Sequence, residues 1–170
     1  MSMNPFCELA IEQSVRLREG KVPSLPVESI TAVSIGEEKT QQILRTALAM
    51  GADKAIHVET EEDPEPLGVA KVLKAIAEKE NVNLILLGKQ SIDKDFGQTG
   101  QMLAGLLGWP QVGSKLHWRS NNQATSAAKM EISNDEKVTV TEEVDGGVQT
   151  VSSKLPMIIT ADLRFISSLG

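Results

Sequence analysis

Residues 84–102 read LILLGKQSIDKDFGQTGQM and join an apolar run to a turn rich in glycine and in amide and hydroxyl side chains. The apolar run is typical of a strand that is buried on both faces, as in a parallel sheet, and Gly88 ends it. The residues after the turn, QTGQMLAGLLG (98–108), predict a short helix. Strand, turn and helix in this order form the unit of an open α/β sheet, whose ligands bind beyond the carboxyl ends of the strands.

The sequence ahead of this unit alternates helix and strand. Asn4 is a candidate N-cap and Pro5 stands at the first helical position of the opening helix. The predicted helices cover 4–20, 40–50 and 67–81, and the predicted strands cover 29–36, 53–59 and 82–88. This alternation predicts an α/β fold with an open, mostly parallel, Rossmann-like sheet that carries helices on both faces.

The pattern changes after the short helix. Residues 112–127 are polar and irregular, whereas 128–155 alternate apolar and polar residues with turn signals at Asn134-Asp135 and Asp145-Gly146, which predicts a β-meander. The segment PMIITADL (156–163) returns as a buried strand. We expect the chain, 1–170, to form a single α/β domain.

Composition narrows the class of protein. A net charge of −6 without any basic run argues against nucleic acid as a partner. No apolar run approaches the roughly 18 residues of a membrane span, so we expect no direct membrane insertion. The single cysteine allows neither an internal disulfide nor a thiolate metal cluster, and a reducing compartment is expected.

The turn after Gly88 has the chemistry of a phosphate site. Gly97 and Gly100 would let the backbone approach a ligand closely, and Gln98 and Thr99 offer donors. The amides at the start of the following helix, together with its dipole, favour an anion. These features suit a phosphate that is bound without any catalytic base.

Charged side chains in the same turn would add to such a site. Lys89 would supply positive charge, and Asp93 and Asp95 would accept hydrogen bonds from ribose hydroxyls or cap the helix. The spacing matches neither a P-loop nor GxGxxG, so an ordinary strand–helix loop with common caps remains an equal alternative.

No catalytic centre is visible. Cys7 stands at a helix start, where a thiol pKa can fall, but no histidine is near it in sequence, and simple helix capping explains NPFC (4–7) as well. His57, predicted in a strand, and His117, predicted in a loop, have no spaced partners that would complete a metal site. We therefore expect a protein that is not an enzyme.

Four segments, taken in order, resemble the β subunit of electron transfer flavoprotein. They are SMNPFCELAIEQSVRLRE (2–19), ILRTALAMGADKAIHVE (43–59), LILLGKQSIDKDFGQTGQMLAGLLGWPQ (84–111) and VDGGVQTVSSKLPMIITADLR (144–164). The last segment carries the family's signature, with Asp145, Gly146, Gly147, Gln149, Val151, Pro156, Ile158, Ile159 and Thr160.

The resemblance implies a heterodimer that carries electrons and has no catalytic residues of its own in this subunit. The α subunit of such proteins mainly holds the FAD, and the β subunit buries one structural AMP. Electrons would come from acyl-CoA dehydrogenases of fatty acid β-oxidation and related dehydrogenases, and would pass to a membrane quinone oxidoreductase. The implied location is the mitochondrial matrix, with the bacterial cytoplasm as the alternative.

The resemblance also implies which residues hold the AMP. They are Asn4, Pro5, Phe6, Cys7, Ile35, Gly88, Lys89, Gln90, Ser91, Ile92, Asp93, Lys94, Asp95, Phe96, Gly97, Gln98 and Thr99. Ile35 stands where the family usually has a small residue, so its backbone would have to serve. Phe6 would also approach the isoalloxazine ring of the partner's flavin.

The sequence departs from the family pattern at four places, one of which is Glu142, where the signature expects a basic residue. Family members have a strand and turn ahead of the part that matches 2–8 and an arm after the part that ends at 164, and we expect both to be missing here. Residues 112–123 look like an insertion. A parallel sheet that lacks a central strand would expose apolar edges.

Two other classes of function remain open at this point. One is a nucleotide-binding regulatory module similar to universal stress proteins, which would bind ATP and form homodimers. The other is a fragment that only makes protein contacts.

Overall fold

The computed structural model describes residues 5–20, 27–61, 65–88, 98–113, 129–132, 137–144 and 147–161. Its helices are α1 (Pro5–Arg18), the 3₁₀-helix η1 (Glu38–Thr40), α2 (Gln41–Met50), α3 (Pro66–Glu80) and α4 (Thr99–Leu107). Its strands are β1 (Thr31–Gly36), β2 (Lys54–Glu59), β3 (Leu84–Gly88), β4 (Gln111–Gly113), β5 (Lys129–Ile132), β6 (Lys137–Val144), β7 (Gly147–Lys154) and β8 (Met157–Ala161).

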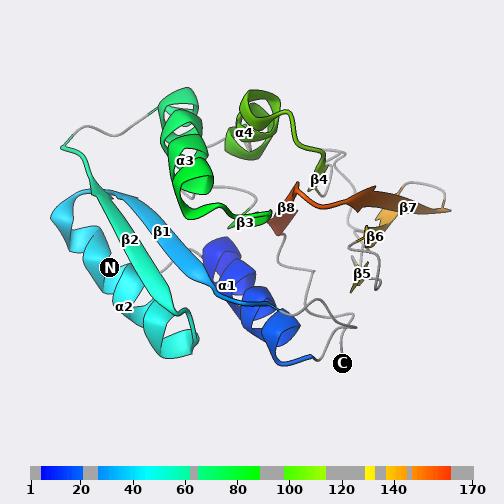
Figure 1. Ribbon diagram of the computed structural model, residues 1–170, viewed down its shortest axis with the longest axis horizontal. Helices are drawn as coiled ribbons and strands as arrows, with labels where there is room; N and C mark the ends of the chain where they lie inside the picture. The colour runs from blue at the N-terminus through cyan, green and yellow to red at the C-terminus, as the bar shows by residue number, and fades with distance from the viewer. Residues whose placement is uncertain are drawn as a thin grey trace, which may run out of the picture.

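The alternation of helix and strand predicted for the first half of the chain is confirmed (Figure 1). Pro5 occupies the first residue of α1, where its missing N–H costs no hydrogen bond. Gly51 ends α2 with a φ of 124°, and Asn81 ends α3 in the left-handed conformation with a φ of 53°. The helix ends therefore follow from local sequence.

The strands form three sheets. β1 and β2 pair in parallel, β3, β8 and β4 form a parallel sheet in the order β3-β8-β4, and β5, β6 and β7 form an antiparallel sheet in that order. The antiparallel sheet confirms the predicted meander. The first two residues of the region expected to be irregular, 112–113, instead belong to β4. This prediction was wrong because a three-residue strand shows no periodicity; β4 owes its existence to its parallel partner β8.

The parallel strands carry helices on both faces, as predicted. Met157 and Ile159 of β8 pack with Leu17 of α1, whereas Ile158 points to the other face and packs with Leu103 of α4. Figure 1 shows α3 and α4 on one side of β3 and β8 and α1 on the other. The three β8 side chains are at most 1% exposed, which is typical of a strand flanked by neighbours and covered on both faces.

The parallel strands do not form the one continuous sheet that was expected. Among the described strands, β1 pairs only with β2, and β3 pairs only with β8. Helix α1 packs against β3 and β8 and also against α2, which covers β1 and β2. Helix packing, rather than strand pairing, therefore holds the two parallel sheets together.

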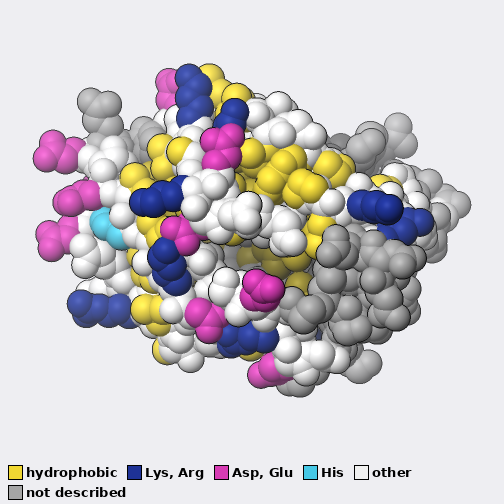
Figure 2. Space-filling view, in the orientation of Figure 1, with side chains coloured by type: hydrophobic (Ala, Val, Ile, Leu, Met, Phe, Trp, Pro, Cys, Tyr) yellow, Lys and Arg dark blue, Asp and Glu magenta, His cyan; other side chains and the backbone are white. Residues whose placement is uncertain are grey.

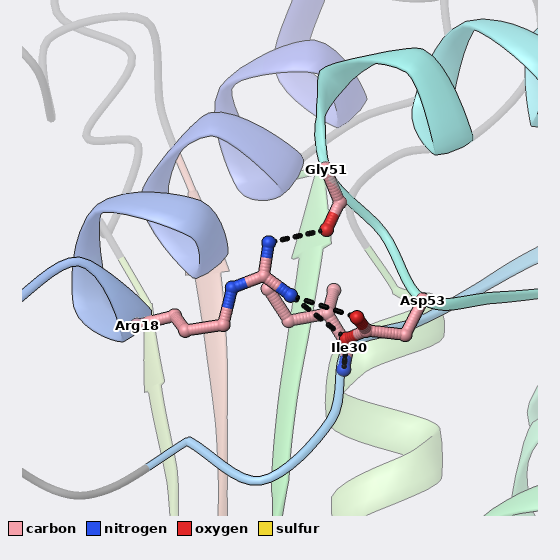
Figure 3. Close-up of polar contacts among 4 residues, drawn as sticks. All are labelled: Arg18, Ile30, Gly51 and Asp53. Atoms are coloured by element: carbon pink, nitrogen blue, oxygen red, sulfur yellow. Dashed lines mark hydrogen bonds and ion pairs between the residues drawn. The ribbon is translucent and has the colours of Figure 1, made fainter.

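A polar network at the end of α1 strengthens this connection (Figure 3). Arg18 Nη1 donates to both carboxylate oxygens of Asp53 at 2.9 Å, and its Nη2 donates to the carbonyl oxygen of Gly51 at 2.6 Å. Asp53 Oδ2 also accepts the amide of Ile30 at 2.8 Å. The network joins the end of α1 to the residues that lead into β1 and β2.

Candidate functional site

The carboxyl end of β3 meets the start of α4. Gly100, in the first turn of α4, lies so close to β8 that a Cβ at this position would be 2.7 Å from Thr160 Cγ2 and 3.2 Å from Gln111 Nε2. Only glycine allows this approach without a shift of the helix. The first turn of α4 is therefore held over the carboxyl ends of the parallel strands, where open α/β sheets bind ligands.

The N-terminus of α4 presents backbone donors at this edge. The first amides of an α-helix have no acceptor within the helix, and no side chain caps them from the N-cap residue Gln98. Gln98 and Thr99 each have an interaction within the protein. The helix dipole and the amides at the start of a helix in general favour an anion. The donor set suits a phosphate.

Cys7 lies at the same edge. Its side chain is exposed to solvent, yet it sits in a concave site surrounded by protein atoms that include Gly88. Burial in this concavity raises the pKa of the Cys7 thiol above its ordinary value, and a hydrogen bond with the Gly88 backbone lowers it by a smaller amount. The thiol is therefore neutral near pH 7, which argues against a nucleophile and is compatible with simple contact to a ligand.

The structure places the other predicted binding residues as follows. Ile35 lies near the end of β1, half-buried and in register with Val58 of β2. The backbones of Pro5 and Phe6 form the start of α1, and Gln98 and Thr99 form the start of α4. Asn4, the side chains of Pro5 and Phe6, and the loop residues Lys89, Gln90, Ser91, Ile92, Asp93, Lys94, Asp95, Phe96 and Gly97 lie outside the described residues. Cys7 and Gly88 are thus the two predicted residues that the structure brings together.

A group of hydrogen-bonded residues around His57, near the ends of β1 and β2, was not predicted as a unit. His57 Nε2 is 2.9 Å from Thr40 Oγ1 and 3.1 Å from the carbonyl oxygen of Gly36. Because the Thr40 hydroxyl donates to the carbonyl oxygen of Glu37 at 2.8 Å, we assign the proton to His57 Nε2, which then donates to both acceptors. His57 lies in a strand as predicted, and its contacts are those of a side chain that fixes the turn after β1.

The described residues hold no candidate for two other kinds of site. No group of three or more histidine, cysteine, aspartate or glutamate side chains in the described ranges could hold a metal ion. Likewise, none of the described helices has the length and apolar character needed to cross a membrane.

The fold places the chain among the open α/β proteins, a class in which ligands generally bind beyond the carboxyl ends of parallel strands. The model of the electron transfer flavoprotein domain family matches residues 1–167. The chain belongs to this family.

Relatives with about half of their aligned residues identical support the assignment. The electron transfer flavoprotein subunit beta of Dictyostelium discoideum is 52% identical over 164 residues, which cover 96% of this chain and 59% of the relative. The mitochondrial subunit beta of Oryza sativa subsp. japonica is 51% identical over 168 residues, covering 96% and 60%. The human subunit beta is 50% identical over 167 residues, covering 96% and 59%. The chain therefore spans about three-fifths of the length of these relatives.

The names of these relatives describe electron transfer rather than a catalysed reaction. This agrees with the prediction of an electron-carrier subunit and disfavours the regulatory module similar to universal stress proteins.

Proposed function

We propose that this chain is the nucleotide-holding part of an electron transfer flavoprotein β subunit. It binds one structural AMP and pairs with an α subunit that mainly holds FAD. The heterodimer passes electrons from acyl-CoA and related dehydrogenases to a membrane quinone oxidoreductase. The mitochondrial matrix is the proposed location, since the rice and Arabidopsis thaliana relatives are named mitochondrial.

One observation carries the AMP proposal: the end of β3, the start of α4 and Cys7 converge at one edge of the parallel sheet. The groups described there fit a phosphate, because Gly100 sets the helix amides close to the strand ends and the side chain of the N-cap residue Gln98 does not cap them. The raised pKa of Cys7 also keeps a thiolate away from a bound anion at neutral pH. A site of donors without a base suits a nucleotide that does not react.

The roles of the individual residues follow from this placement. The backbone from Gly88 to Thr99 would hold the phosphate, and Asn4 to Cys7 would contact the adenylate from the start of α1. Ile35 would contribute its backbone from the end of β1. In this proposal, AMP stabilises the subunit and the interface with the α subunit, while the electron-carrying flavin belongs mainly to the partner.

Co-expression with an electron transfer flavoprotein α subunit from one of the relatives' organisms tests the proposal. We expect a yellow heterodimer that releases AMP on denaturation, in about a one-to-one ratio to protein, as identified by chromatography and mass spectrometry. ATP, or no nucleotide, in the released fraction would contradict the AMP proposal. A colourless homodimer would contradict the heterodimer.

A variant of the turn localises the AMP. Gly97→Val should lower AMP content and heterodimer yield together, because a branched side chain blocks close approach of the backbone to the phosphate. Gly105→Ala is the matched control, since a Cβ at Gly105 meets nothing within 4 Å. Unchanged AMP content in the Gly97 variant would show that the phosphate does not bind at this turn.

A further inference from the structure

The imidazole of His57 holds the backbone at the point where β1 ends. Its Nε2 lies 3.1 Å from the carbonyl oxygen of Gly36, the last residue of β1, and 2.9 Å from Thr40 Oγ1. The same carbonyl oxygen accepts the amide of Thr60, the residue after β2, at 3.2 Å. Two donors from β2 and the residue that follows it therefore hold one carbonyl group at the end of β1.

Gly36 is a residue that needs such a restraint. Its φ of 152° lies in a region that L side chains rarely adopt, and a Cβ at this position would be 3.1 Å from Thr40 Cγ2. Glycine has access to many other backbone conformations, so the residue alone does not fix the direction in which the chain leaves β1. The hydrogen bonds to its carbonyl oxygen supply the restraint.

Thr40 ties the rest of the turn to the same imidazole. Its side chain is buried, and its hydroxyl donates to the carbonyl oxygen of Glu37 at 2.8 Å while it accepts from His57. The amide of Thr40 also donates to the carbonyl oxygen of Glu37, at 2.9 Å. The turn from Gly36 to Thr40 is thus closed on itself and joined to β2 through the side chain of His57.

The end of β1 lies close to the candidate phosphate site. Ser34 of β1, Cys7 of α1 and Gly88 of β3 line one cavity. Ile35, a predicted binding residue, stands between Ser34 and Gly36 in the chain. The position of the Ile35 backbone therefore depends on how the carbonyl group of Gly36 is held.

The charge at the ends of β1 and β2 indicates which part of a nucleotide would lie there. Figure 2 shows acidic side chains gathered where these two strands finish. Glu37, Glu38, Glu59 and Glu61 are all exposed, and Lys39 is paired with Glu37. Because carboxylates repel a phosphate, we expect the phosphate at the start of α4 and the uncharged nucleoside at the end of β1.

We propose that His57 is a positioning residue of the AMP site: its Nε2–H holds the Gly36 carbonyl group, and with it the backbone of Ile35, in the conformation that contacts the nucleoside. This inference rests on the proposed function, in which Ile35 contributes its backbone to AMP. His57 acts through the turn and does not touch the ligand. Without it, binding has to order the turn from Gly36 to Thr40, and this ordering costs affinity.

The test measures how fast AMP leaves the heterodimer formed with an electron transfer flavoprotein α subunit. The complex is loaded with radiolabelled AMP and then mixed with an excess of unlabelled AMP. His57→Ala should release the label about five- to tenfold faster, which is the range that the loss of one ordering hydrogen bond predicts. An unchanged release rate would overturn the inference.

Two further substitutions of the same histidine separate positioning from a general loss of stability. The amide nitrogen of glutamine can replace Nε2 as a donor, so His57→Gln should keep the release rate within about twofold of the unaltered protein. His57→Asn is too short to reach Gly36 and should behave like His57→Ala. Equal release from the Gln and Ala variants would overturn the inference, because the donor at Nε2 would then not matter.

Thr46→Ala is the matched control on α2. It removes a 3.2 Å hydrogen bond from an exposed hydroxyl to the carbonyl oxygen of Gln42, away from the end of β1. Its release rate should stay within about twofold of that of the unaltered protein. Release as fast as that of His57→Ala would show a general loss of stability and would overturn the positioning role.

A measurement on the unaltered heterodimer decides the question if the His57 variants fail to fold. Hydrogen exchange in residues 34–40 should be slower with AMP bound than after AMP is removed by dialysis, because the nucleotide contacts the backbone that His57 holds. Equal exchange in the two states would overturn the inference.

Failure of this inference is distinguishable from failure of the proposed function. An unaltered heterodimer that contains no AMP would contradict the AMP site itself, and the role of His57 with it. Normal AMP content together with unaffected release from His57→Ala would overturn the role of His57 alone.

Discussion

Gln13 is a fully buried side chain on α1, 1% exposed, and neither polar atom of its amide has a hydrogen-bond partner among the described residues. A buried amide without a partner is costly, by about 1–3 kcal/mol. We expect Gln13→Met, which keeps the length of the side chain, to raise the free energy of unfolding by about that amount. Urea unfolding followed by circular dichroism measures the shift. Gln42→Met, at an exposed position of α2, is the control and should change little.

Loss of stability in the Gln13 variant would show that this amide has a partner in solution. The position also shows a limit of sequence reasoning. A glutamine at helical spacing on an apolar face looks like a boundary residue, and nothing in the local pattern indicates complete burial.

The pKa of Cys7 gives a prediction about pH. Because burial raises this pKa, less of the reactive thiolate exists at neutral pH, so alkylation should be slow there although the side chain is exposed. The rate should rise with pH, and the pH of its midpoint should lie above that of a free cysteine, whose pKa is about 8.5. The alkylation rate by iodoacetamide, measured as a function of pH for the protein and for a short peptide with one cysteine, checks this. A midpoint below that of the peptide would contradict the neutral thiol and revive a reactive role.

The network of Arg18 and Asp53 joins residues 35 positions apart, so no local pattern could have predicted it. Asp53→Ala removes the acceptor of Arg18 Nη1 and of the amide of Ile30, while Arg18 Nη2 keeps the carbonyl oxygen of Gly51. Both side chains of the ion pair are partly exposed, so the Coulomb part is small, and we expect a loss of about 1–2 kcal/mol, mostly from the unpaired amide. Chemical denaturation measures it. Lys74→Ala, which breaks a 3.8 Å pair within α3, should cost less than about 0.5 kcal/mol; an equal loss would contradict the role of the network.

Two glycines of α4 allow a matched pair of substitutions that tests how this helix packs on β8. Gly100→Ala places a Cβ 2.7 Å from Thr160 Cγ2, so α4 has to shift from β8, and we expect a loss of about 1–3 kcal/mol. Gly105→Ala meets nothing within 4 Å and should gain about 0.5–1 kcal/mol through helix propensity. Thermal unfolding of both variants checks the pair. A stabilising Gly100 variant would show that the close approach of α4 to the strand ends is wrong.

The helices and strands themselves could mostly be predicted from local sequence. Periodicity and end signals such as Pro5 and Gly51 indicate where helices lie, and the apolar run at 84–87 indicates a strand. The burial expected for this strand is reached only in part, since all five residues of β3 are half-buried. β4 could not be predicted, since three residues have no period and this strand depends on pairing with β8. The candidate site was partly predictable in the same way: the end of β3 and the start of α4 follow from sequence, but the contact of Cys7 with Gly88 depends on how α1 packs on β3.

At the scale of the whole molecule, the sequence predicts a parallel α/β sheet but not its division. Strand patterns predict where each strand lies, whereas the partner of each strand depends on contacts between distant parts of the chain, and among the described strands β1 pairs with β2 and β3 with β8. The division leaves a cavity between the two parallel sheets, and the candidate ligand edge lies at the carboxyl end of β3. Packing of α1 across both sheets and the network of Arg18 keep the edge in place without a continuous sheet.

The central claim is that AMP is bound at the carboxyl end of β3 by the residues between Gly88 and Thr99. Photolabelling of the heterodimer with 8-azido-AMP, followed by peptide mapping, tests it directly. We predict label on peptides that contain 88–99 or 4–7, and competition by unlabelled AMP. Label on α2 or on the meander at 128–155, or label that AMP does not displace, would contradict the claim.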